Sequence, residues 1–194
     1  MPSNKEKILH TALKLFYESS YEDVSVRDIA SAADVKIPAI YSHFESKEGI
    51  LKALYDFFDK HWKESAPDFD EILRSAETEP PHVVLMKADF RFDPAVEQTM
   101  SRIIAIAARD INFERSQKFI KENILDRITD FFKPLLECMI QLRRIEPFDV
   151  DTFISVYKNY AFSAAFLYGT PFQVDLKNWL AGMNMLLSLV KPAK

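Results

Sequence analysis

The chain carries only three glycines, at positions 49, 169 and 182, and no run in which apolar and polar residues alternate between Asn-Gly or Asp-Gly turns. Half-buried strands need that alternation and those turn signals, so strands are not expected. Prolines at 67, 80, 81, 94, 134, 147 and 171 divide the chain instead into segments whose apolar residues have helical spacing. The sequence therefore predicts an all-α protein.

Composition places the chain among globular proteins. Its 194 residues are 48% hydrophobic and 28% charged, which is enough for one substantial core or two small ones. The single cysteine, Cys138, excludes an intramolecular disulfide framework and favours a reducing compartment. No apolar segment follows the N-terminus, and the apolar stretch 179–190 is too short to span a bilayer. We therefore expect a cytoplasmic protein that makes no membrane contact.

The first fifty residues have the start signals of three short helices. Ser3 and Ser25 are each followed three residues later by an acid, which is the capping-box spacing. Pro38 stands where the first turn of a helix tolerates proline, and Ile40 and Phe44 then share one face. Two short helices joined by a turn of three or four residues form a helix-turn-helix, whose second helix can enter the DNA major groove.

The third helix carries an unusual outward face. With Val35, Ile40 and Phe44 turned inward, the outward residues are Lys36, Ile37, Ala39, Tyr41, Ser42 and His43. Hydroxyl donors, a cation and small apolar groups suit contacts with phosphates, base edges and thymine methyl groups. Ser46 is expected to cap a fourth helix, so that its first amides and Lys47 face a phosphate.

The run VRDIASAADVKIPAIYSHFESKEGIL, residues 26 to 51, resembles the DNA-binding region of the TetR family of bacterial transcriptional regulators. The resemblance lies in the order and spacing of Val26, Arg27, Ile29, Ala30, Ile40, Tyr41, His43, Phe44, Ser46 and Lys47. It implies an N-terminal helix-turn-helix domain and a larger helical domain that binds a small molecule and dimerises. The implied function is that of a repressor that binds operator DNA as a homodimer and is released by an effector.

The resemblance also implies roles by position. Ser25 and Arg27 would contact phosphate or a base edge. Bases would be faced by Lys36, Ile37, Pro38, Ala39 and Ser42, and the phosphate backbone would be held by Tyr41, His43 and Lys47. The chain departs from the family pattern at Asp34, where glycine is usual, and at Lys36, where serine or threonine is usual. Whether these two residues alter DNA specificity stays open.

Charge limits the kind of DNA binding that is expected. Residues 1–50 carry six Lys or Arg against eight Asp or Glu. Affinity would then come from a few directed cations and helix N-termini, and a nonspecific DNA coat is not expected. The alternative is that Tyr41 and His43 are ordinary surface residues on a helical hairpin.

The remaining chain predicts a helical domain over residues 49–194, following a DNA-binding domain over residues 1–48. A fourth helix should run to Pro67 and bridge the two domains. Further helices are expected over 96–110, 116–144 and 149–169, with a kink or break near residues 130–133 caused by Pro134.

Two of these helices are apolar on more than one face, which predicts a twofold dimer. The expected interface residues are Ile124, Ile128, Phe131, Leu135, Phe153, Ala161, Ala164 and Tyr168. The alternative is an ordinary monomeric core.

The effector site is less well defined by the sequence. An apolar cavity could be lined by Phe90, Met100, Ile104, Phe131, Tyr157 and Tyr160, with His82, Arg102, Arg109 and Asn112 as polar contacts. A lipophilic or aromatic effector fits such a lining, but no constellation fixes its chemistry. The effector, the operator, the regulated genes and the choice between repressor and activator stay unknown.

Catalytic chemistry has no candidate residues. The histidines at 10, 43, 61 and 82 lack the spacing of a helical metal site, and no Gly-rich phosphate loop occurs. We expect no metal, no cofactor and no enzyme activity. Two alternatives to a DNA-binding regulator stay open: a helical small-molecule-binding protein without DNA-binding activity, and an unrecognised helical enzyme.

Overall fold

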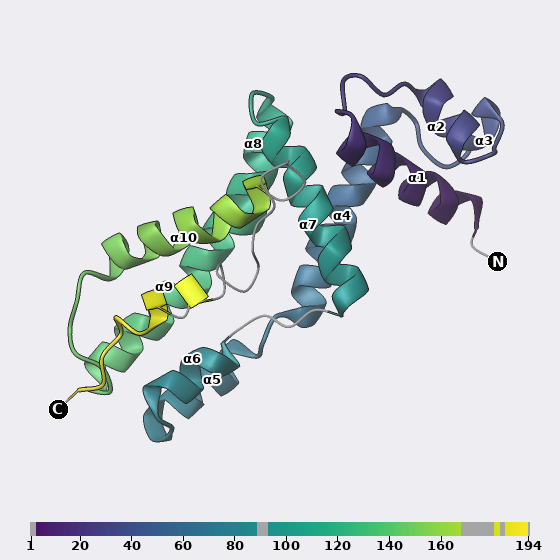
Figure 1. Cartoon of the computed structure of the whole chain (residues 1–194). Helices are drawn as coiled ribbons and strands as arrows, with labels where there is room; N and C mark the ends of the chain where they lie inside the picture. Colours follow the sequence, from purple (N-terminus) through teal and green to yellow (C-terminus); the bar gives the residue numbers. More distant parts are fainter. Residues whose placement is uncertain (1–2, 89–92, 168–180, 183–184, 194) are drawn as a thin grey trace. The chain divides into compact units, whose positions relative to one another are not determined.

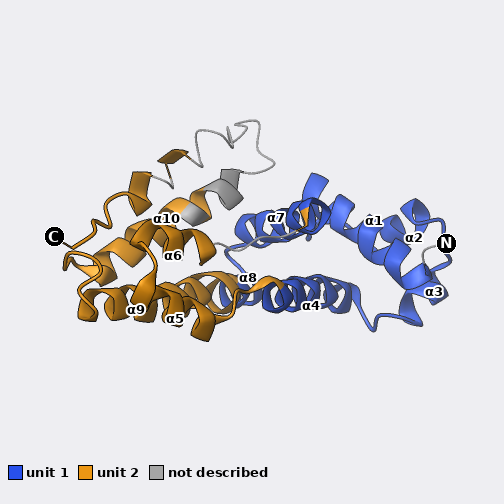
Figure 2. Ribbon diagram, turned by 90° about the horizontal axis from the view of Figure 1, so that it is seen from below, with its two compact units in different colours: residues 1–64, 94–119 blue, residues 65–93, 120–194 orange. Residues whose placement is uncertain are grey.

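The computed structural model describes residues 3–88, 93–167, 181–182 and 185–193, and every regular element within these ranges is a helix (Figure 1). The chain divides into two compact units (Figure 2). Unit 1 comprises Met1–Glu64 and Pro94–Phe119, and unit 2 comprises Ser65–Asp93 and Ile120–Lys194. The all-α prediction is confirmed.

Unit 1 contains the three N-terminal helices that the sequence predicted, followed by further helices. Its elements are α1 (Asn4–Glu18), α2 (Val26–Ala32), α3 (Ile37–Tyr41), α4 (Lys47–Ser65), α7 (Pro94–Arg109) and α8 (Glu114–Ile120). Ser3 and Ser25 both form complete capping boxes, with Glu6 and Asp28 respectively. The Ser46 hydroxyl accepts the Gly49 N–H at 3.0 Å and so caps α4.

The core of unit 1 is built from one apolar face of each helix. Side chains with no exposed surface come from α1, α2, α3, α4 and α7, and include Ile8, Phe16, Ile29, Ile40, Phe58 and Ile103. Helix α1 packs against α2, α3 and α7. This packing gives α3, which has only five residues, a support that so short a helix cannot supply itself.

Unit 2 is formed by α5 (Phe69–Thr78), α6 (Pro81–Lys87), a π-helical turn (Lys121–Leu125), α9 (Asp126–Gln141) and α10 (Val150–Leu167). Helix α9 packs against α5 and α10. The sequence predicted no helix in the region of α5 and α6.

The predicted irregularity at Pro134 is not a break. Helix α9 continues through Pro134, and the irregular segment is the π-helical turn that precedes α9. The expected boundary between residues 48 and 49 separates a DNA-binding domain from an effector-binding domain. The two compact units are defined instead by which residues contact one another. The expected boundary stays a prediction.

Candidate nucleic-acid interface

The turn between α2 and α3 is closed by backbone hydrogen bonds. Asp34 donates its N–H to the Ser31 carbonyl at 3.3 Å, and Val35 donates to the Ala30 carbonyl at 3.0 Å. Asp34 has a φ of 52°, the left-handed conformation that glycine adopts most readily. Aspartate tolerates this region better than most side chains, so the departure from glycine leaves the turn intact.

Helix α3 is held by its inner face and lacks a side-chain cap. Lys36 occupies the N-cap position without a side-chain hydrogen bond, and Pro38 stands in the first turn. Ile40 is fully buried and Phe44 nearly so. The residues that remain exposed are Lys36, Ile37, Pro38, Tyr41, Ser42 and His43, with Ala39 half-buried.

The exposed face of α3 offers several kinds of contact. Tyr41 has 54% of its surface exposed, and its phenol can donate or accept a hydrogen bond. The Ser42 hydroxyl donates to the Ala39 carbonyl at 2.8 Å, which leaves its oxygen lone pairs as acceptors. Lys36 adds a cation and Ile37 an apolar group. These groups can meet phosphates, base edges and thymine methyl groups.

The start of α2 is fixed by its capping box. The Asp28 carboxylate accepts the Ser25 N–H at 2.8 Å and the Ser25 hydroxyl at 2.6 Å. The side-chain hydrogen bond from Ser25 lowers the pKa of Asp28, and the backbone bond adds to this effect. The Ser25 hydroxyl is therefore engaged within the helix cap, and Arg27 is the exposed cation of this first turn.

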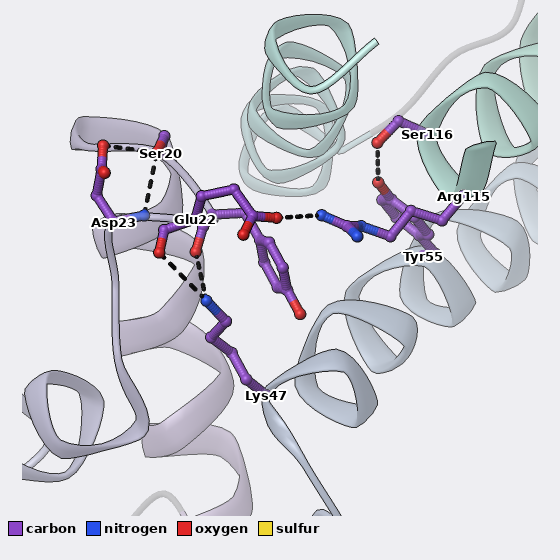
Figure 3. A network of polar contacts seen from close by, with 8 residues as sticks. Ser20, Glu22, Asp23, Lys47, Tyr55, Arg115 and Ser116 are labelled. Carbon is purple, nitrogen blue, oxygen red and sulfur yellow. Dashed lines mark hydrogen bonds and ion pairs between the residues drawn. The ribbon is translucent and has the colours of Figure 1, made fainter. Parts of the chain in front are cut away.

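The Lys47 side chain makes hydrogen bonds within unit 1. Its Nζ donates to the Tyr21 carbonyl at 2.8 Å and to the Glu22 carbonyl at 3.5 Å (Figure 3). The same Nζ lies 4.2 Å from the centroid of the Tyr21 ring. Lys47 thus ties the start of α4 to the segment between α1 and α2, and its predicted phosphate contact stays a prediction.

Two further cations near this region were not identified from the sequence. Lys5 on α1 lies 5.9 Å from the centroid of the Phe44 ring, beside the end of α3. Arg115 on α8 donates to the Glu22 carboxylate at 2.8 Å. No local signal could have revealed either contact, because each depends on how segments distant in sequence pack together.

The predicted ligand residues are distributed over both units. Met100 is buried and Ile104 half-buried on α7 of unit 1. In unit 2, the Phe131 ring contacts Phe132, whose ring lies 5.1 Å from that of Tyr157. Tyr160 is half-buried, and Phe90 lies outside the described residues.

Two surface hollows of unit 2 have other linings. One of about 290 Å³ is lined by residues of α6, including His82 and Met86, and by residues near the C-terminus. A second, more open one of about 600 Å³ lies along α5 and α6. His82, one of the predicted polar contacts, lines the first hollow, but no described residue of the predicted apolar lining borders either hollow. The role of the predicted ligand residues stays a prediction. Arg102 and Arg109 instead contact Tyr17, through its ring and its carbonyl respectively.

The predicted interface residues also differ in exposure. Ile124, Ile128 and Leu135 are buried within the single chain, so they have little surface left for a partner. Phe131 and Phe153 are half-buried. The side chains of Ala161 and Ala164, and the whole of Tyr168, lie outside the described residues. The proposed interface stays a prediction.

Within the described ranges, membrane-spanning helices and metal-binding clusters are both absent. No helix there is both long enough and apolar enough to cross a membrane. The same residues contain no group of three or more His, Cys, Asp or Glu side chains placed to hold a metal ion.

Residues 8–54 match the family model described as bacterial regulatory proteins, tetR family. The HTH-type transcriptional repressor ComR of Escherichia coli (strain K12) is 36% identical over 53 residues, which are 27% of this chain and 25% of that protein. The biofilm operon icaADBC HTH-type negative transcriptional regulator IcaR of Staphylococcus aureus (strain Newman) is 34% identical over 59 residues, 28% of this chain and 32% of that protein. The chain therefore spans between a quarter and a third of these curated relatives.

Solved structures extend the likeness in fold to the whole chain. A putative transcriptional regulator from Saccharomonospora viridis, in complex with choline, has a TM-score of 0.65 at 16% identity and covers 98% of each chain. A transcriptional regulator of the TerR/AcrR family from Aquifex aeolicus VF5 has a TM-score of 0.58 at 18% identity, covering 96% of this chain and 99% of that one. A gamma-butyrolactone receptor (ArpA like protein) has a TM-score of 0.60 at 13% identity, covering 96% and 98%.

Proposed function

Because the chain belongs to the TetR family of bacterial regulatory proteins, we propose that it is a transcriptional repressor that binds operator DNA. Residues 1–48 form the DNA-binding domain, and residues 49–194 bind a small-molecule effector and dimerise. The protein acts in the cytoplasm as a homodimer, and effector binding releases it from DNA.

The observation that carries this proposal is the exposed face of α3. Tyr41, Ser42 and His43 are exposed together on a helix whose inner residues, Ile40 and Phe44, are buried. A structural hairpin does not need this clustering of donors, whereas a reading helix does. DNA contacts are therefore assigned to the exposed residues of α3, with Ser25, Arg27 and Lys47 beside them.

The release from DNA would follow from a change in the orientation of α4. A small molecule bound among the C-terminal helices would favour one tilt of α4, which follows the DNA-binding domain directly. That tilt changes the separation of the two reading helices from the ~34 Å that adjacent major-groove faces require. The choline complex of one protein of similar fold supports a small organic effector as a class.

Tyr41 is a better choice for substitution than Lys47. Lys47 also stabilises unit 1, so its substitution would affect both the fold and DNA binding. The probe is the duplex that the unaltered protein retains most strongly from a random-sequence library. Tyr41→Ala should weaken binding of this duplex about tenfold, the loss expected for one hydrogen bond to a charged group. Fluorescence anisotropy measures the affinity, and thermal unfolding checks the fold.

The matched control is Met86→Ala in unit 2. Met86 is 61% exposed, comparable to Tyr41, and it is not among the predicted DNA contacts. This variant should bind the selected duplex as tightly as the unaltered protein. Unchanged binding by a folded Tyr41→Ala variant would remove α3 from the interface. Failure of the unaltered protein to retain any duplex would favour a small-molecule-binding protein without DNA-binding activity.

A further inference from the structure

Arginines of α7 and α8 reach the segment between α1 and α2. This segment, residues 19–25, is called the α1–α2 loop below. Arg109, at the end of α7, donates through Nη1 to the Tyr17 carbonyl at 2.9 Å and to the Ser19 carbonyl. Arg115, on α8, donates through Nη2 to the Glu22 carboxylate at 2.8 Å (Figure 3). All of these residues belong to unit 1.

Tyr21 is the centre of these contacts. Its side chain is buried, and its ring packs on Phe16 with centroids 5.1 Å apart. The guanidinium carbon of Arg115 lies 4.4 Å from the Tyr21 centroid, while Lys47 Nζ approaches the same ring to 4.2 Å. One buried ring is therefore held by cations from α8 and α4, in addition to the hydrogen bonds on either side of it.

The position of Arg115 is fixed by the packing of its helix, α8, against α4. The neighbouring Ser116 is fully buried, and its hydroxyl lies 3.4 Å from the Tyr55 hydroxyl of α4 (Figure 3). The Tyr55 ring stacks on Phe119 at 4.0 Å between centroids. Arg115 also lies 4.4 Å from the Phe113 centroid, and only 27% of its side chain is exposed. It is therefore not a mobile surface arginine available to phosphates.

We propose that Arg115 is a positioning residue for operator binding, acting on the α1–α2 loop through Glu22 and Tyr21 without touching DNA. The proposal rests on the proposed function. The α1–α2 loop ends at Ser25, the cap of α2, and α2 leads into α3 through a closed turn. A shift of the loop therefore shifts both helices, and base readout tolerates little displacement of the residues that perform it.

The test measures affinity for the duplex selected by the unaltered protein and for a poly(dA-dT) duplex, each over a range of salt concentrations. Arg115→Gln should bind the selected duplex about tenfold more weakly, the combined effect expected for one ion pair and two ring contacts. Binding of poly(dA-dT) should change less, because phosphate contacts are retained. The dependence of log K on log salt should be unchanged, whereas loss of a phosphate contact lowers that slope by about 1.

Glu22→Gln distinguishes positioning from simple electrostatics. Removing an anion from the DNA-binding domain strengthens DNA binding if charge alone matters, but weakens it if Glu22 holds the loop. We expect weaker binding. The exchanged pair Glu22→Arg with Arg115→Glu should recover most of the lost affinity, and it also serves as the test if Arg115→Gln does not fold.

Lys118→Gln is the matched control. Lys118 is exposed on the same helix, and this substitution also removes one positive charge. This variant should bind both duplexes as the unaltered protein does. The inference is overturned if Arg115→Gln binds the selected duplex normally, if its salt slope falls, or if Lys118→Gln weakens binding equally. If the unaltered protein selects no duplex, the proposed function fails first, and that outcome is distinct from all three.

Discussion

Asp110 is a buried acid whose surroundings disfavour its charged form. It follows α7, it is 5% exposed, and its Oδ2 has no hydrogen-bond partner among the described residues. Burial raises the pKa of the carboxyl, although the nearby Arg115 acts in the opposite direction. The folded chain therefore retains this proton at pH values at which the unfolded chain has lost it. The stability linked to Asp110 is highest below the unfolded pKa and falls as pH rises through the folded pKa.

Asp110→Asn removes this charge with little change of shape. At neutral pH, the free energy of unfolding should rise by about 1 kcal/mol, because a buried and incompletely bonded charge is no longer required. The gain should shrink as the solution is acidified toward the folded pKa. Urea unfolding at several pH values measures both effects, with the exposed Asp56→Asn as a control expected to stay within about 0.5 kcal/mol. A loss of stability at neutral pH would mean that the attraction to Arg115 outweighs burial.

Residues that act on their immediate neighbours were predicted well from the sequence. Ser3, Ser25 and Ser46 cap helices as expected, because a cap depends on residues three positions away. Lys47 was expected to face a phosphate, yet it donates to the backbone of the α1–α2 loop. Its partners and those of Arg115 are distant in sequence, so no spacing pattern could have revealed them.

The turn between α2 and α3 holds a residue that is not ideal for its conformation. A left-handed backbone costs an L-residue roughly 1–2 kcal/mol, and aspartate less. Asp34→Gly should therefore raise the free energy of unfolding by up to about 1 kcal/mol, while Asp34→Val should lower it by a similar amount. Thermal or urea unfolding measures both. Equal stability of the two variants would show that the turn does not require this conformation.

Arg143 provides the comparison in unit 2. Its φ is 54°, close to the 52° of Asp34. Because arginine lacks the short polar side chain that eases this conformation, Arg143→Gly should give at least as large a gain as Asp34→Gly. A gain at Arg143 without one at Asp34 would mean that the aspartate side chain already removes the strain from the turn.

The course of α9 shows that the break expected from Pro134 does not occur. Proline inside a helix costs about 3 kcal/mol, which predicted a kink or break. Leu135, Leu136 and Met139, just beyond Pro134, are all fully buried. Their burial contributes roughly 1.5–3 kcal/mol each, which exceeds the cost of the proline. Packing therefore keeps α9 continuous, and this balance depends on tertiary contacts that the sequence pattern does not contain.

For the molecule as a whole, the fold class was predictable and the grouping of its helices was not. The scarcity of glycine and the helical spacing of apolar residues were sufficient to predict the all-α fold class. The grouping of the helices could not be predicted, because α7 and α8 join α1–α4 in unit 1 although they are distant in sequence. For the same reason, apolar spacing could not distinguish a dimer interface from an internal core at Ile128 and Leu135, which are buried within one chain.

The most direct test of DNA binding by α3 is to sequence the duplexes that the purified protein retains from a random-sequence library. A homodimer with two reading helices should enrich one twofold-symmetric sequence, with half-site centres about one helical turn, or about 34 Å, apart. The Tyr41→Ala variant should lose this enrichment. Retention of no common sequence, or of a single unpaired half-site, would contradict a dimeric operator-binding repressor.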